Sequence, residues 1–315
     1  MELHQIRYFV EVARVRNFTR AAERCHISQP TLSHQIRKLE EELGEPLFHR
    51  QRSGVRLTPF GDIFYPRATR ILQEVKSVED EALSFQQEVR GVLRIGVIPT
   101  IAPYLLPRLV EAMIEQHPGV TFEVSEDPTE ILLQRLRHGQ LDMALASPPL
   151  PDEQDWRLCD LLEDELLITL PRHHPLAGRQ QLSLDELKQH PLVLMKEAHC
   201  LSQQSLSVCH RAGFQPNVKI ESSQLETVLA LVEVGLGLSF TPSIALPFMS
   251  PREVVFSSIA PQSVFRRISL IWPKSAAPTR AHLAFLELAQ ELFASMPKAK
   301  GEAVLPVETK GGTGS

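Results

Sequence analysis

The sequence predicts an α+β protein of several domains, with a small basic helical head, one long linking helix and an α/β body. Three observations predict it. The chain has 315 residues, more than one typical domain of ~100–200 residues. Residues 1–70 carry twelve Lys and Arg against eight Asp and Glu, so they are +4 while the rest of the −5 chain is −9. Near residue 91 the pattern changes to alternating strands and helices, which is typical of an α/β domain.

The amino-acid composition excludes several classes of protein. Hydrophobic residues make up 43% and charged residues 23%, which supports packed cores and argues against disorder. No run of ~18 apolar residues is present, and the opening MELHQIRYFVEVA lacks the apolar core of a secretory signal. We therefore expect a cytoplasmic protein with no membrane partner. The four cysteines are too unevenly spaced for a disulfide framework, which leaves free thiols, a redox pair or a metal site open.

Residues 1–58 predict a helix-turn-helix head with a wing. Apolar residues recur at helical spacing over residues 3–14, and a second short helix follows. Ser28 caps a third helix, which Gly44 ends. Residues 47–57 are typical of a small hairpin with Ser-Gly at its tip.

The outer face of the third helix is polar in a way that suits a nucleic acid, because its side chains can bond base edges or phosphates. These residues are Gln29, Thr31, Ser33, His34, Gln35 and Arg37. The hairpin adds three arginines suited to backbone phosphates, namely Arg50, Arg52 and Arg56. We expect the head to bind double-stranded DNA; the alternative is a solvated polar helix beside a basic loop that holds no ligand.

Residues 59–90 predict a long amphipathic helix. Its apolar stripe consists of Ile63, Ile71, Val75, Val78, Ala82 and Phe85. Such a helix has nothing of its own to pack against, so a second copy of the chain is the expected partner. A homodimer would carry two heads that read two half-sites of a near-palindrome.

Residues 91–296 predict an α/β domain with mostly parallel sheets. Strands are expected at 93–98, 121–125, 143–146, 166–170, 192–195, 218–220 and 268–272. Helices are expected at 103–117, 130–139, 201–212, 225–235 and 278–296. The last helix can return to the first lobe, which gives lobe I at about 91–161 plus 267–296 and lobe II at about 162–266. A ligand of such a fold lies in the cleft near helix N-termini. Residues 297–315 have no periodicity and are expected to be a disordered tail.

Two cysteines of the body, Cys200 and Cys209, are nine positions apart. On one helix they would be separated by a rise of ~13.5 Å and lie on opposite faces, whereas a disulfide needs Cα atoms within about 7 Å. A bond between them therefore requires the helix to break, which would make the pair a switch. The helix start and the neighbouring His199 are expected to favour the Cys200 thiolate.

Other interpretations of the cysteines remain open. Cys25 and Cys159 are expected to be structural. Cys200 and Cys209 can also be unbonded structural residues. A zinc site formed by His199, Cys200, Cys209 and His210 is a further interpretation. It is disfavoured because two ligands adjacent in sequence strain tetrahedral geometry.

Residues 1–66 closely resemble the winged helix-turn-helix domain of LysR-type transcriptional regulators. The matching stretches are LHQIRYFVEVARVRNFTRAAERCHISQPTLSHQIRKLEEELGEPLFHR and RLTPFG. The resemblance implies a recognition helix in the major groove, a linker helix that dimerises the heads, and a periplasmic-binding-protein-like effector domain. It also implies a homotetramer and RNA polymerase as a partner. The implied DNA-binding residues are Ser28, Gln29, Pro30, Thr31, Ser33, His34 and Arg37, with Arg50 and Arg52 on phosphate or minor groove.

Within that family, the chain resembles the OxyR hydrogen-peroxide sensors. The similar segments are residues 98–107, His199-Cys200-Leu201, Cys209, residues 223–227 and Arg266. The resemblance implies a peroxidatic Cys200 and a resolving Cys209, with Thr100, His199 and Arg266 around the peroxide. The implied cycle runs from the thiolate to sulfenic acid and then to a disulfide that a cellular dithiol reduces. One departure is Ser202-Gln203, where OxyR-like sequences usually carry Arg-Asp.

A second class of function also fits the predicted fold. A regulator of the same family could bind a small organic anion in the cleft near Thr100, Thr129 and the helix start at Ser202 and Gln203. No pair of carboxylates and no Ser–His–Asp set at a convincing spacing is evident, so we expect no enzyme activity. We also expect no cofactor and no resident metal.

Overall fold

The computed structural model describes residues 1–51, 54–84, 89–196 and 198–294. Its head consists of three helices, α1(Leu3–Val15), α2(Phe18–Arg24) and α3(Gln29–Leu43), and the hairpin of β1(Phe48–Gln51) and β2(Gly54–Leu57). The Asn17 side chain accepts a hydrogen bond from Arg20 N at 3.1 Å at the start of α2, and the Ser28 hydroxyl accepts one from Thr31 N at 3.3 Å at the start of α3. Gly44 ends α3 at φ 74°, as expected of a residue without a Cβ.

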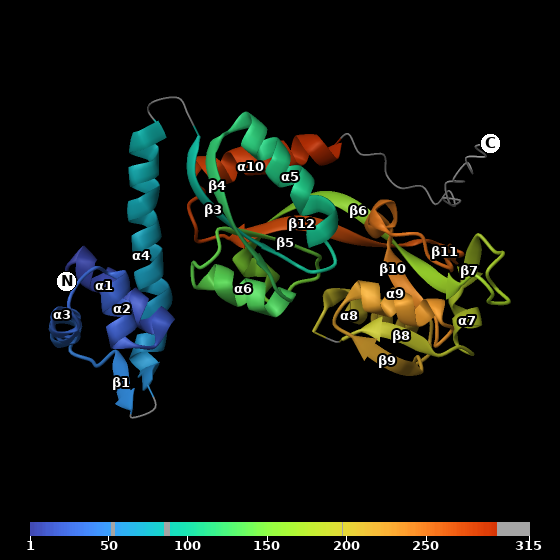
Figure 1. Ribbon diagram of the computed structural model, residues 1–315, viewed down its shortest axis with the longest axis horizontal. Helices are drawn as coiled ribbons and strands as arrows, with labels where there is room; N and C mark the ends of the chain where they lie inside the picture. Colours follow the sequence, from blue (N-terminus) through green and yellow to red (C-terminus); the bar gives the residue numbers. More distant parts are fainter. Residues whose placement is uncertain (52–53, 85–88, 197, 295–315) are drawn as a thin grey trace, which may run out of the picture.

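The long helix α4(Pro59–Ser84) stands beside the head and beside the body (Figure 1). Its first turn is capped by Thr58, whose hydroxyl accepts from Gly61 N at 2.9 Å. Phe64, Tyr65 and Ala68 on one side are buried in the core of the head. Ile63 and Val78 are exposed at 56% and 65%, so the chain by itself leaves an apolar stripe of α4 uncovered.

The body is built on an eight-stranded sheet of order β4-β3-β5-β12-β6-β11-β7, with β10 paired to β6. Its strands are β3(Arg90–Val97), β4(Gly119–Glu126), β5(Met143–Ala146), β6(Trp156–Pro171), β7(Gln181–Ser183), β10(Ser239–Pro242), β11(Val254–Ala260) and β12(Val264–Pro273). The expectation of mostly parallel sheets is wrong. The two longest strands of this ladder, β6 and β12, run antiparallel from Leu166↔Val264 to Trp156↔Pro273, and β10 and β11 also pair antiparallel with β6.

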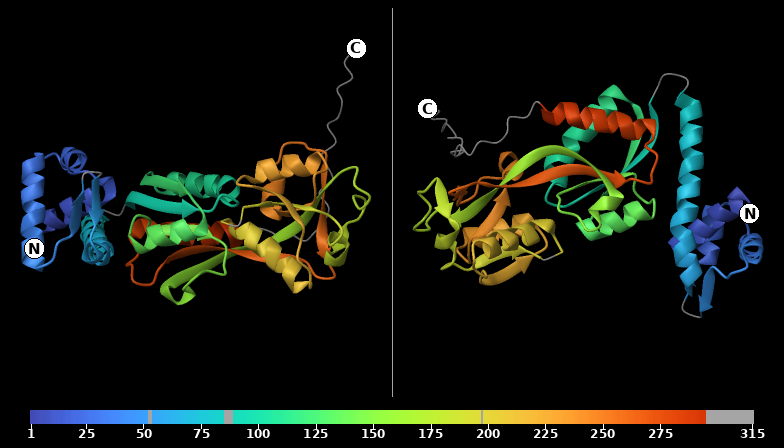
Figure 2. Two further views of the ribbon diagram at one scale, coloured as in Figure 1. Left: turned by 90° about the horizontal axis from the view of Figure 1, so that it is seen from below. Right: turned by 180° about the vertical axis from the view of Figure 1, so that it is seen from behind.

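The first lobe contains β3, β4 and β5, with helices on both faces of the sheet. Helices α5(Ala102–Gln116) and α10(Arg280–Ala294) cover one face and α6(Thr129–Arg137) the other (Figures 1 and 2). The predicted return of the last helix to this lobe is confirmed: Phe285 of α10 is fully buried in one core with Leu93 and Ile95 of β3.

The second lobe combines β7, β10 and β11 with the parallel pair β8(Leu192–Met195) and β9(Val218–Ser222). Its helices are α7(Leu184–Leu187), α8(Cys200–Arg211) and α9(Leu225–Glu233), and the 3-10 helix η2(Ser243–Phe248) follows β10. A further 3-10 turn, η1(Glu153–Asp155), precedes β6. The long strands join the lobes, because Ile268 of β12 lies in the core of the first lobe whereas Leu166 of β6 lies in a core of the second.

Candidate functional site

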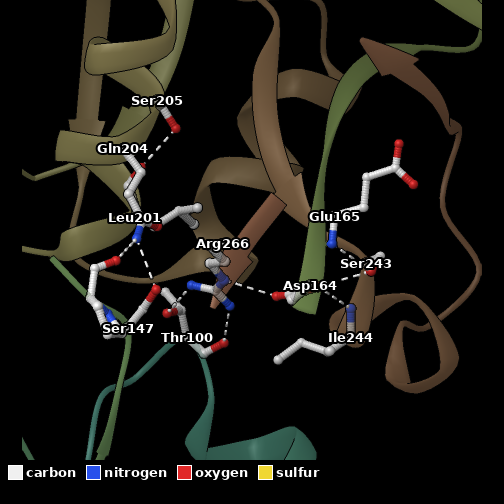
Figure 3. Close-up of polar contacts among 11 residues, drawn as sticks. Thr100, Ser147, Asp164, Glu165, Leu201, Gln204, Ser205, Ser243, Ile244 and Arg266 are labelled. Atoms are coloured by element: carbon white, nitrogen blue, oxygen red, sulfur yellow. Dashed lines mark hydrogen bonds and ion pairs between the residues drawn. The ribbon is translucent and has the colours of Figure 1, made fainter. Parts of the chain in front are cut away.

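A buried arginine connects the two lobes. Arg266 on β12 is 3% exposed, and its Nε donates to Asp164 Oδ2 at 2.8 Å. Its Nη1 donates to the Thr100 hydroxyl at 2.9 Å, and its Nη2 donates to the Thr100 carbonyl at 3.1 Å (Figure 3). Arg266 and Asp164 are cross-strand partners in the β12–β6 register, and Thr100 follows the end of β3. The guanidinium therefore fixes the start of α5 to the long strands.

The carboxylate of Asp164 is fully engaged on its other oxygen as well. Oδ1 accepts from the Ser243 hydroxyl at 2.8 Å and from Ile244 N at 3.0 Å (Figure 3). The sequence reasoning missed Asp164. The feature of the sequence that could have indicated it is the acidic run at 163–165, which lies opposite Arg266 and Arg267 once β6 and β12 are paired.

Cys200 is the first residue of α8 and packs against the core of the first lobe. Burial raises the pKa of its thiol above the usual value. The positive charge of Arg266 opposes this rise, and so do contacts with the Thr129 hydroxyl, the Leu201 backbone N–H and the Thr100 hydroxyl. The helix start does favour the thiolate as expected, through the Leu201 backbone N–H, but the loss of water around the sulfur outweighs this and the other favourable groups, so the thiol pKa is raised.

His199 precedes α8 and is 8% exposed. Burial lowers the pKa of its imidazole, and the nearby Lys196 lowers it further. The ring is therefore neutral at neutral pH and supplies no positive charge to the thiol, contrary to the expectation. Arg266 takes that role instead.

Cys209 lies on the same uninterrupted helix, α8, and all four cysteines are free thiols. It is fully buried in a core of the second lobe with Leu192 and Phe240, whereas Cys200 contacts the first lobe. Burial raises the pKa of the Cys209 thiol to about 11. The nine-residue spacing on a continuous helix corresponds to a rise of ~13.5 Å. In this arrangement the two sulfurs cannot bond.

The predicted effector-cleft residues are only partly brought together. The Thr129 hydroxyl oxygen, at the start of α6, is buried against the Cys200 thiol and has no other hydrogen-bond partner among the described residues. The Ser202 hydroxyl is also buried and, in the part of the chain that the structure describes, unpartnered. Gln203 instead lines a hollow on the outer surface of α8, with Leu206 and His210.

Gln204, one position later, also reaches from α8 to the first lobe. Its Nε2 donates to the Ser147 hydroxyl at 2.8 Å and to the Pro148 carbonyl at 3.3 Å (Figure 3). The sequence reasoning did not single out Gln204. Its place four positions after Cys200, on the same side of the helix, was the available signal.

The structure gives no support to the zinc reading. Across residues 1–51, 54–84, 89–196 and 198–294, no three His, Cys, Asp or Glu side chains lie close enough together to hold a metal ion. Within the same ranges, none of the helices has the length and apolar character needed to cross a bilayer.

The exposed surface of α3 carries most of the predicted DNA-binding residues. Exposed side chains are Ser28, Gln29, Pro30, Thr31, His34 and Arg37. Ser33 was expected on this face, but it is only 8% exposed, because it lies one position from buried Leu32 and three from buried Ile36. On the wing, Arg56 is exposed. Arg52 and the side chain of Arg50 lie outside what the structure describes.

Comparison with known proteins covers nearly the whole chain. The family described as bacterial regulatory helix-turn-helix protein, lysR family, matches residues 3–62, and the LysR substrate binding domain matches residues 86–294. A hydrogen peroxide-inducible genes activator of Haemophilus influenzae is 34% identical over 246 residues, or 78% of this chain and 81% of that protein. The DNA-binding transcriptional dual regulator OxyR of Escherichia coli is 32% identical over 297 residues, or 94% and 96%.

Solved structures agree with the sequence comparisons. A full-length OxyR variant from Pseudomonas aeruginosa superimposes with a TM-score of 0.79 at 32% identity, over 92% of this chain and 95% of that one. The similarity therefore extends through the head, the long helix and the body rather than being confined to one domain.

Proposed function

Because the chain belongs to the LysR family of bacterial transcriptional regulators, we propose that it is a DNA-binding regulator switched by hydrogen peroxide through a Cys200–Cys209 disulfide. One observation carries the proposal. A cysteine at the start of α8 lies beside the buried Arg266–Thr100 pair, and a second cysteine lies in the same helix. One of the named relatives is a hydrogen peroxide-inducible genes activator, which supports the choice of peroxide as the signal.

The proposed chemistry begins with the Cys200 thiolate. It attacks one peroxide oxygen, so an S–O bond forms, the O–O bond breaks, and the leaving hydroxide takes a proton to become water. Arg266 stabilises both the thiolate and the departing oxygen. The Thr100 hydroxyl accepts from Arg266, so its own proton is available to donate to the sulfur or the peroxide.

The second step joins the two cysteines. The Cys209 thiol gives up its proton as its sulfur attacks the sulfur of the Cys200 sulfenic acid. An S–S bond forms, the S–O bond breaks, and the hydroxyl leaves with that proton as water. A cellular dithiol reverses the bond. Because α8 keeps the sulfurs apart, this step requires α8 to unwind, and the repacked second lobe then changes how the subunits hold the DNA-reading heads.

Each part of the fold has its own proposed role. Residues 1–58 bind DNA, residues 59–90 pair with a second copy, and residues 91–296 sense the signal. Within this sensing domain, lobe I spans about 91–161 plus 267–296 and lobe II about 162–266. The exposed edge of α3 provides Gln29, Thr31 and His34 for base edges, while Arg37, Arg50 and Arg52 hold phosphates. Ser33 is only 8% exposed and is therefore left out of this DNA-facing set. A homotetramer and contact with RNA polymerase belong to the same proposal.

The decisive experiment substitutes Cys200→Ser in the full-length protein. A DNA fragment selected from a random pool by the reduced protein serves as the operator, and its footprint is measured with and without one equivalent of peroxide. We expect peroxide to alter the wild-type footprint and to leave that of the variant unchanged, because serine forms no sulfenic acid. Cys159→Ser, which changes a partly exposed cysteine on β6, is the matched control and should respond as the wild type does.

A metabolite-responsive regulator is the second candidate. The buried hydroxyl of Ser202 near the start of α8, which has no hydrogen-bond partner among the described residues, favours it, because such a group can bond a small organic anion that enters between the lobes. An unaltered peroxide response in the Cys200→Ser protein would select this second function over the first.

A further inference from the structure

A second cavity lies away from the cysteines, between α4 and the first lobe. It has a volume of about 250 Å³. One wall is α4, and the other is formed by residues of β3, the end of α6 and the segment that leads into α10. Figure 1 shows α4 standing along this edge of the lobe, with the start of α10 directed toward it.

The two walls are joined by specific contacts next to the cavity. Gln73 Nε2 on α4 donates to the Gly139 carbonyl at 2.8 Å. Gln140 Nε2 donates to the Tyr65 hydroxyl at 3.3 Å, and the Tyr65 ring lies edge-on to His138 with centroids 5.8 Å apart. These contacts hold α4 against the first lobe and so fix the two walls of the cavity relative to each other.

Its lining is strongly basic. The cationic residues are Arg67, Arg70, Lys76, Arg94 and Arg137, against two acidic ones, Glu74 and Asp142. Asp142 is already engaged, since its carboxylate accepts from the Arg94 backbone N at 2.7 Å. Arg67 and Arg70 make no ion pair with any described residue. Arg94 and Arg137 are paired with carboxylates outside the cavity, Glu123 at 3.1 Å and Asp152 at 2.6 Å, so the uncompensated positive charge comes mainly from Arg67 and Arg70, and it favours an anion.

A buried donor provides an independent sign of a ligand. His282 lines the cavity at 3% exposure, and its Nε2 has no hydrogen-bond partner within the described ranges. Burial lowers the pKa of this imidazole to about 4, so the ring is neutral and its Nε2 can carry a proton to donate. His282 lies in the first turn of α10, where its own backbone N–H donates to the Thr279 hydroxyl at 3.2 Å and the positive end of the helix dipole favours a negative charge.

We propose that this cavity binds a small anion with a phosphate or carboxylate group, held by Arg67 and Arg70 from α4 and by His282, at the start of α10, from the lobe. Such an anion bridges the helix that carries the DNA-reading head and the sensing domain. A duplex is too large for a recess of this volume, which favours a small molecule over the DNA backbone. The site does not depend on peroxide chemistry.

The test is calorimetric titration of the reduced full-length protein at constant ionic strength, in one arm with inorganic phosphate and in the other with succinate. We expect saturable binding in at least one arm, and the stronger arm identifies the ligand class. Arg70→Gln should weaken that binding about tenfold, the loss of one charge-assisted hydrogen bond. His282→Phe keeps an aromatic ring but removes Nε2, and should weaken it similarly.

Arg108→Gln, a change of an exposed arginine on α5, is the control and should bind as the wild type does. Arg70 is exposed, so its variant is expected to fold normally even if His282→Phe does not. The proposal is overturned if neither anion binds saturably, if Arg70→Gln binds as tightly as the wild type, or if short duplex DNA but no small anion protects Arg70 from chemical modification.

Discussion

Replacing Arg266 with leucine is expected to destabilise the body of the protein by about 3–5 kcal/mol, a shift of roughly 10 °C in its thermal transition. The loss of stability comes from Asp164, the carboxylate that remains after the arginine is removed. The side chains of Arg266 and Asp164 are 1% and 0% exposed, so the substitution leaves a carboxylate in the interior without its counter-charge. The Thr100 hydroxyl and carbonyl lose their donors at the same time.

The adjacent residue provides the control. Arg267 pairs with Asp160 at 3.1 Å, but both side chains are half exposed. Water screens such a pair, so Arg267→Leu should cost less than about 1 kcal/mol. Urea and thermal unfolding of both variants check the comparison. Equal losses for the two substitutions would show that the buried pair contributes no more than a surface pair.

Oxidation by peroxide is expected to raise the hydrogen-exchange rate of backbone amides in α8 by roughly a hundredfold or more. Those amides are protected in the reduced protein by the hydrogen bonds of a continuous helix from Cys200 to Arg211. A disulfide between its two cysteines breaks that helix, and it also removes Cys209 from the buried core that it shares with Phe240.

Two comparisons make the exchange experiment specific. Helix α9 carries no cysteine, so its amides should keep their protection in the same oxidised sample. The Cys209→Ser protein can form the sulfenic acid but no bond within α8, so its α8 should stay protected after peroxide. Unchanged exchange in oxidised wild-type α8 would contradict the proposed remodelling.

Local chemistry predicted much of the fold. The cap Ser28 and the terminator Gly44 bound α3 as expected, and the strands at 143–146 and 192–195 occur at the predicted residues. These features depend on neighbouring residues alone. The strands β7, β10 and β11 were missed because they are short or interrupted by serines, and their pairing with β6 and β11 comes from distant segments.

The candidate site was predictable in its residue types but not in its electrostatics. The sequence indicated Cys200, Thr100 and Arg266, and the structure brings these three together. It could not indicate Asp164, because that partner is set by the register of two long strands. Nor could it give the burial of Cys200 and His199, because burial depends on tertiary packing, such as the contact of Cys200 with the core of the first lobe. That burial reverses the predicted direction of the thiol pKa.

The most direct test of the account is peptide mass spectrometry of the full-length protein after one equivalent of hydrogen peroxide, with free thiols alkylated before digestion. The account predicts one cross-linked product, in which the peptides containing Cys200 and Cys209 are joined while Cys25 and Cys159 are alkylated. Alkylation of both Cys200 and Cys209 after peroxide, or a bond from Cys200 to either of the other cysteines, would contradict it.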